Sequence, residues 1–75
     1  MKVTVYSKPS CQACNLTKIW LDNHNLSYTA INAYEDADAM AELQSHGFMS
    51  FPVVTVDGWD NAWTGFEIDR LEELL

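Results

Sequence analysis

Residues 7 to 14 read Ser7-Lys8-Pro9-Ser10-Cys11-Gln12-Ala13-Cys14, and they hold the only two cysteines of the chain. An alternating apolar run at residues 2–6 precedes them, and an amphipathic run follows. A C-x-x-C at a strand-to-helix junction places both sulfurs on one turn, where a disulfide can form. Because the loop that this bond closes is very short, the bond adds little stability. We therefore expect the pair to serve chemistry rather than folding.

The length and composition predict one small domain over residues 1–75. Hydrophobic residues make up 48% of the chain, and no repeat, linker or low-complexity segment interrupts it. No apolar run approaches the roughly 20 residues of a membrane span, and the N-terminus lacks the pattern of a signal peptide. We therefore expect a cytoplasmic protein that binds no membrane. In the reducing cytosol, two cysteines spaced by two residues indicate a metal-binding or catalytic role.

The net charge is −7, from eleven acidic and four basic residues. Nucleic-acid binding needs clustered Lys and Arg, so the charge argues against a nucleic-acid partner. Lys8 and Lys18 bracket the two cysteines. This local cationic bias favours a thiolate and an acidic partner surface, although two ordinary solvated lysines explain the pattern equally well.

Periodicity and turn residues predict the element order βαβαββα. Strands are expected at residues 2–6, 27–32, 53–56 and 59–62, with Asp57-Gly58 as the turn of the last pair. Helices are expected over residues 11–23, between Asn32 and Gly47, and after Thr64. The β-α-β start implies a right-handed parallel crossover, and the closing hairpin adds an antiparallel pair. The expected fold is α/β: a mixed sheet of four strands flanked by three helices, the plan of the thioredoxin and glutaredoxin fold.

Three N-cap signals precede the expected helices: Ser10, Asn32 with Glu35, and Thr64 with Glu67 in a T-x-x-E capping box. His24-Asn25 and Gly47 are expected to end the first two helices.

The predicted position of Cys11, in the first turn of a helix, suits a nucleophile. Unpaired backbone N–H groups and the positive end of the helix dipole stabilise a thiolate there. Cys11 must be solvent-accessible to attack a foreign disulfide, whereas Cys14 lies one turn deeper. Cys14 can then attack the mixed disulfide and release the reduced partner. The sequence thus predicts that Cys11 attacks and Cys14 resolves.

Three segments of the chain together resemble the glutaredoxin-like NrdH redoxins, small electron donors associated with class Ib ribonucleotide reductase. They are Val5 to Cys14, then Gly47-Phe48 leading to Phe51-Pro52-Val53-Val54, then Trp63-Thr64-Gly65-Phe66 with Asp69-Arg70. The last is the most discriminating. It resembles the W-S-G-F of that group, whereas common glutaredoxins carry Gly-Gly followed by an acidic residue. Ser50-Phe51 likewise replaces the Thr-Val that serves glutathione binding in common glutaredoxins.

The resemblance implies that Cys11 and Cys14 cycle between dithiol and disulfide, with no bound cofactor. It implies electrons from NADPH through thioredoxin reductase, and a protein substrate such as ribonucleotide reductase, for a monomeric carrier. It also implies that Pro52 is cis, turns the backbone of Phe51 toward an incoming peptide and blocks a metal between the sulfurs. The implied partner-facing residues are Lys8, Gln12, Phe51, Pro52, Val53, Trp63, Thr64, Gly65, Phe66 and Asp69.

The chain departs from the usual pattern of this family at Glu67-Ile68-Asp69, which stands where members usually have Arg-Pro-Asp. The reversed charge at position 67 puts in doubt any partner contact made by the family's arginine. We hypothesise that it marks a divergent member matched to a different reductase.

Three other functions remain open on the sequence. A glutathione-dependent glutaredoxin would use Lys8 for the glutathione carboxylate. A zinc or iron–sulfur module would use the cysteines as ligands, but His24 and His46 are twenty-two residues apart and do not fit a zinc-finger spacing. A redox-inert binding domain on the same fold is the third. Trp63 fits either a packed aromatic or a partner contact, Trp20 is expected in the core, and Trp59 has no predicted place.

Overall fold

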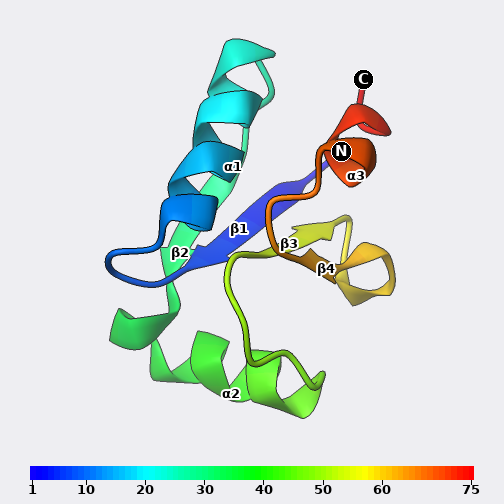
Figure 1. Cartoon of the computed structure of the whole chain (residues 1–75). Coiled ribbons are helices and arrows are strands. Elements are labelled where there is room, and N and C mark those ends of the chain that lie inside the picture. Colours follow the sequence, from blue (N-terminus) through cyan, green and yellow to red (C-terminus); the bar gives the residue numbers. More distant parts are fainter.

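The computed structural model describes every residue, 1–75, and contains the predicted mixed sheet (Figure 1). Its strands are β1 (Val3–Ser7), β2 (Thr29–Asn32), β3 (Val53–Val56) and β4 (Trp63–Thr64). They lie in the order β2-β1-β3-β4, with β1 parallel to β2 and antiparallel to β3. β4 is antiparallel to β3. The predicted parallel first pair and antiparallel last pair are therefore confirmed, whereas the order of the strands within the sheet was not predicted.

Three α-helices, α1 (Gln12–Asn23), α2 (Ala37–Ser45) and α3 (Ile68–Glu72), flank this sheet. Two short 3-10 helices, η1 (Ala33–Glu35) and η2 (Trp59–Asn61), precede α2 and β4. α1 and α3 cover one face of the sheet, and α2 covers the other (Figure 1). No helix is long and apolar enough to cross a membrane.

Alternation along the strands divides the buried residues between these two faces. The larger core joins Leu21 of α1 and Leu71 of α3 to Val3 and Val5 of β1. The smaller core joins Leu43 of α2 to the side chains that point the other way, such as those of Tyr6 and Val53. Both faces of the sheet are thus covered, as in other sheets that carry a β-α-β crossover.

The expected helix ends are confirmed at Asn25 and Gly47. Both adopt a left-handed backbone, with φ of 57° at Asn25 and 81° at Gly47. In each case the residue after the left-handed one donates its N–H back into the last turn, from Leu26 to Leu21 and from Phe48 to Leu43. This is the Schellman arrangement that satisfies the last carbonyls of a helix.

The expected helix starts are wrong in three places. Cys11, not Ser10, is the N-cap of α1, and Ser10 has a left-handed φ of 56°. Asn32 caps only the 3-10 turn η1, whereas the carboxylate of Asp36 caps α2. Glu67 occupies the N-cap of α3 without a side-chain bond, so the predicted capping box from Thr64 does not form.

The last hairpin also differs from its prediction. Residues 59–61 form η2 rather than a strand, and the strand is the two-residue β4 that follows. Asp57 and Gly58 both have positive φ, at 56° and 114°, so the turn is where it was expected. β2 likewise begins at Thr29, two residues later than predicted.

Trp59 lies in an aromatic group on the α2 face, a place the sequence did not predict. Its ring stacks on Tyr6 at 5.4 Å and on His46 at 4.3 Å between centroids. Its indole N–H donates to the Glu42 carboxylate at 2.8 Å. Trp20, which was expected in the core, is half-buried against the larger core and stacks on His24 at 3.8 Å.

Candidate functional site

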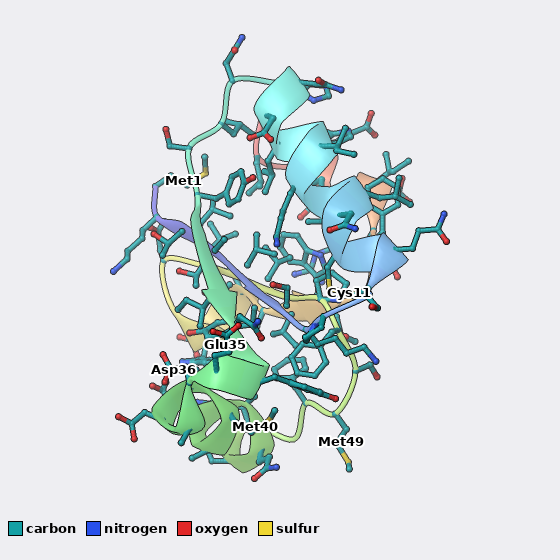
Figure 2. All side chains as sticks on the ribbon, turned by 90° about the vertical axis from the view of Figure 1, so that its left-hand side faces the viewer. Met1, Cys11, Glu35, Asp36, Met40 and Met49 are labelled. Carbon is teal, nitrogen blue, oxygen red and sulfur yellow. A yellow bond between two sulfur atoms is a disulfide. The ribbon has the colours of Figure 1, made fainter.

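The two cysteines meet at the amino end of α1 and form a disulfide. Their Cα atoms are 5.3 Å apart, which suits a disulfide between residues three apart at a helix start. The Cys11 sulfur also accepts the backbone N–H of Cys14 at 3.2 Å. This sulfur therefore replaces the side-chain oxygen that usually caps a helix. Figure 2 shows Cys11 at this end of α1.

The two sulfur-bearing residues differ in exposure in the predicted order, but both are largely covered. The exposed fraction is 7% for Cys11 and 1% for Cys14. The expectation of a freely accessible Cys11 is therefore wrong for the disulfide form, in which only an edge of this residue reaches solvent. Cys14 is the inner residue, as predicted, and it lies between α1 and the sheet with Thr17 and Leu21 among the buried residues of that helix.

No acidic side chain lies within the first turn of α1, where a Cys11 thiolate would form. Gln12 is the exposed first residue of this helix. Lys8 is exposed in the preceding turn, and the only ion pair of the protein joins Arg70 and Glu73, at 3.8 Å. The positive end of the α1 dipole is thus available to an anion on Cys11 in the reduced protein.

Residues 50–52 lie at the same end of the sheet as the dithiol. Tyr6 pairs with Val53 across β1 and β3, so Pro52 falls opposite Ser7, the last residue of β1. The Phe51–Pro52 peptide bond is cis. Pro52 is buried, whereas Phe51 is half-buried.

Thr64 and Gly65 hold this segment from the neighbouring strand. The Thr64 hydroxyl shares its one proton between the carbonyl oxygens of Ser50, at 3.0 Å, and Pro52, at 3.1 Å. The N–H of Gly65 donates to the same Pro52 oxygen at 2.8 Å. Gly65 has a φ of 94°, a conformation that residues with a side chain rarely adopt. Three of the predicted site residues therefore contact one another directly.

An apolar groove of about 220 Å³ lies beside Phe51 and was missed at the level of sequence. Its lining residues are Tyr34, Met40, Gln44, Phe48, Met49 and Phe51. Tyr34 meets Phe51 edge to face at 6.1 Å, and Met49 has an exposed fraction of 90%. Apolar residues at 48, 49 and 51 in a connection between two elements were the available signal, because loops normally expose polar side chains.

The remaining predicted residues lie apart from the dithiol or are covered. Val53 is fully buried in the smaller core, so its side chain is not free to meet a partner. Trp63 has an exposed fraction of 7%, and the Arg70 guanidinium lies over its ring at 4.9 Å. Phe66 packs against the larger core, and Asp69 is exposed on α3 with no ion pair.

Tyr6, near this end of the sheet, has a shifted pKa. Burial raises the pKa of the Tyr6 hydroxyl above its usual value near 10, and the negative charges of Glu42 and Asp36 raise it further. Acidic groups thus gather on the α2 face, and none lies in the first turn of α1.

No three His, Cys, Asp or Glu side chains lie close enough together to hold one metal ion. A metal held by this chain alone would lack the four ligands of a structural zinc site.

Comparisons with known proteins agree with this architecture. The family model for glutaredoxin matches residues 3–59, which include both cysteines and Pro52. The glutaredoxin-like protein NrdH of Lactococcus lactis is 38% identical over 72 residues, covering 96% of this chain and 97% of that protein. NrdH of Escherichia coli is 31% identical over 74 residues, covering 99% of this chain and 89% of that protein.

A solved structure shows that the likeness extends to three dimensions. The NrdH-redoxin of Escherichia coli superposes with a TM-score of 0.92 at 29% sequence identity, covering 100% of this chain and 96% of that one. The thioredoxin-like fold is thereby confirmed. The relatives named NrdH also span the Trp63-to-Phe66 segment, which lies outside the residues matched by the general glutaredoxin model. The chain therefore belongs to the glutaredoxin family and, within it, to the NrdH group of glutaredoxin-like redox proteins.

Proposed function

We propose that this protein is an electron carrier that reduces disulfides in other proteins, with class Ib ribonucleotide reductase as its recipient. The proposal rests on the Cys11–Cys14 pair, which lies at the start of α1, a helix with no acidic residue in its first turn. The apolar groove beside Phe51 supports a protein partner, because such a groove accepts the apolar side chains of another chain. The cytosol is the proposed compartment, because it keeps such a pair reduced.

The reaction transfers two electrons in two exchange steps. The Cys11 thiolate attacks one sulfur of the partner's disulfide, forming a mixed disulfide and releasing one partner thiolate. The Cys14 thiolate then attacks the Cys11 sulfur, which breaks the mixed disulfide and releases the second partner thiolate. The two released thiolates take up protons, and Cys11 and Cys14 remain joined as in this structure.

Thioredoxin reductase is the proposed source of electrons, with NADPH as its reductant. The solved NrdH-redoxin of Escherichia coli is described as having a thioredoxin-like activity profile, which supports this choice over glutathione. The test offers the oxidised protein either thioredoxin reductase or glutathione with glutathione reductase, and follows the absorbance of NADPH. Rapid consumption is expected with the thioredoxin reductase of the same cell. Consumption with glutathione alone would instead identify a glutathione-dependent glutaredoxin.

Trapping with Cys14→Ser identifies the recipient. Without the resolving thiol, Cys11 is expected to hold its partner as a stable mixed disulfide, which mass spectrometry can identify. Cys11→Ser with Cys14 intact is the matched control and should capture nothing. If both variants captured the same proteins, Cys11 would not be the attacking residue.

The exposed position of Glu67 supports the hypothesis that this protein is matched to its own thioredoxin reductase. Its side chain is exposed at the N-cap of α3 and makes no capping bond, so its carboxylate is free to meet a partner. Glu67→Arg is expected to raise the rate with an ordinary bacterial thioredoxin reductase, whereas Glu72→Arg, an exposed acid later in α3, should not. Full-rate reduction of the unchanged protein by that reductase would contradict this adaptation.

A further inference from the structure

The backbone of residues 49–51 has few internal hydrogen bonds. The N–H groups of Met49, Ser50 and Phe51 make none with the rest of the protein, and neither does the Phe51 carbonyl. Phe51 therefore offers one donor and one acceptor from a single residue. These are the two groups that an extended chain uses when it pairs with a strand.

One side chain fixes the position of these groups. The Ser50 carbonyl accepts a hydrogen bond only from the Thr64 hydroxyl, at 3.0 Å. The Pro52 carbonyl accepts from the same hydroxyl, at 3.1 Å, and also from the N–H of Gly65. The hydroxyl thus holds the chain on both sides of Phe51, and on the Ser50 side it has no substitute.

The placement of this contact connects it to the dithiol. Pro52 precedes Val53, which pairs with Tyr6 at the end of the β1–β3 register, and Ser7, the last residue of β1, precedes the turn that leads to Cys11. The predicted role of Thr64, capping α3, is not used, because Glu67 occupies that N-cap. The hydroxyl is therefore committed to residues 50–52, at the end of the sheet where a partner's disulfide must arrive.

We propose that Thr64 is a positioning residue, whose hydroxyl holds the Phe51 peptide groups where they pair with the main chain of an extended polypeptide carrying the disulfide. This inference rests on the proposed function, disulfide reduction by Cys11 and Cys14. It predicts a preference for disulfides within polypeptides over small disulfides that lack peptide groups. Thr64 acts only through the segment that it holds.

The test uses single-turnover reduction of two substrates, insulin and hydroxyethyl disulfide, by the pre-reduced protein. Thr64→Val keeps the branched shape and removes the hydroxyl. The ratio of the insulin rate to the hydroxyethyl disulfide rate is expected to fall about tenfold, the factor that corresponds to about 1.4 kcal/mol of lost hydrogen bonding. Thr64→Ser restores the hydroxyl and should return this ratio to near its original value.

Thr29→Val is the matched control, since Thr29 is an exposed threonine on the opposite edge strand whose hydroxyl makes no hydrogen bond within the protein. It should leave the ratio unchanged. If Thr64→Val does not fold by circular dichroism, Thr64→Ala provides the same test. Equal losses with both substrates, no loss with either, or a serine variant that behaves like valine would overturn the role of Thr64. An unchanged protein that reduces neither substrate would overturn the proposed function itself.

Discussion

α1 and α2 begin in different ways, although both are amphipathic helices packed on opposite faces of one sheet. The N-cap of α1 is the sulfur of Cys11, which accepts the Cys14 N–H at 3.2 Å, and no acid lies in its first turn. The N-cap of α2 is the carboxylate of Asp36, which accepts the Ala39 N–H at 3.0 Å, with Asp38 in the first turn.

The start of α2 thus serves stability, whereas the start of α1 serves reactivity. Carboxylates at the start of α2 interact favourably with the positive end of the helix and satisfy its free N–H groups. At α1 the same field is left for the one atom that must carry negative charge during thiol exchange. The chain therefore places the stronger cap where no chemistry is proposed.

The largest expected effect comes from replacing the sulfur cap. Cys11→Ser should reduce the rate of insulin reduction to that of dithiothreitol alone, because the attacking thiolate is gone. The serine hydroxyl still caps α1, so in a Cys14→Ser background Cys11→Ser should be about 1 kcal/mol more stable than Cys11→Ala. Urea unfolding measures this difference. Equal stability of the two variants would show that position 11 does not cap the helix in the reduced state.

Removing the carboxylate cap should affect stability alone. Asp36→Ala is expected to lower the free energy of unfolding by about 1 kcal/mol, because the Ala39 N–H loses its partner. Urea denaturation with matched thiol-exchange assays checks both properties. Asn32→Ala is the contrasting variant, because Asn32 caps only η1. If Asn32→Ala lowered the free energy of unfolding more than Asp36→Ala does, Asn32 would be the more important cap, as the sequence predicted.

Making the start of α1 acidic, like that of α2, should slow the chemistry moderately. Gln12→Glu places a negative charge in the first turn and disfavours the Cys11 thiolate. Alkylation of the reduced protein by iodoacetamide at neutral pH should then slow by about two- to fivefold at low salt, and by less at high salt. Gln44→Glu, near the end of α2, is the control and should not alter this rate. An accelerated Gln12→Glu variant would contradict the electrostatic account.

The smallest expected effect concerns alkaline pH. The pKa of Tyr6 is raised by burial and then by Glu42 and Asp36, so folding favours its neutral form. This stabilisation is full below about pH 10 and is lost as pH rises through the raised pKa of the folded state. Asp36→Asn keeps a capping side chain but removes the charge, so its Tyr6 titration should shift to lower pH. Phenolate absorbance, compared with Tyr6→Phe, measures the shift.

The sequence predicted features that depend on near neighbours. The cysteine pair, the helix ends at Asn25 and Gly47, and the succession of helices and strands along the chain all follow from residues within a few positions of one another. These signals have local causes: backbone conformation at the left-handed positions and periodicity along the elements.

Features that depend on distant residues were not predictable. Thr64 and Glu67 match a capping box, but the Thr64 hydroxyl bonds to residues 12 and 14 positions away instead. Tyr34 and Phe51 meet only because the fold brings η1 and residues 50–52 together, and Trp59 stacks on Tyr6 and His46 for a similar reason. Local patterns hold no information on such pairings, which the tertiary fold decides.

The 5.3 Å between the Cα atoms of Cys11 and Cys14 is a spacing that the start of α1 supplies without help from the bond. Oxidation and reduction thus demand little movement of the backbone in that turn, and a partner would meet nearly the same backbone in both redox states. The oxidised protein would then compete with the reduced protein for the same binding sites on its partners. The rate of electron transfer would then depend on the ratio of reduced to oxidised protein rather than on the total amount of protein.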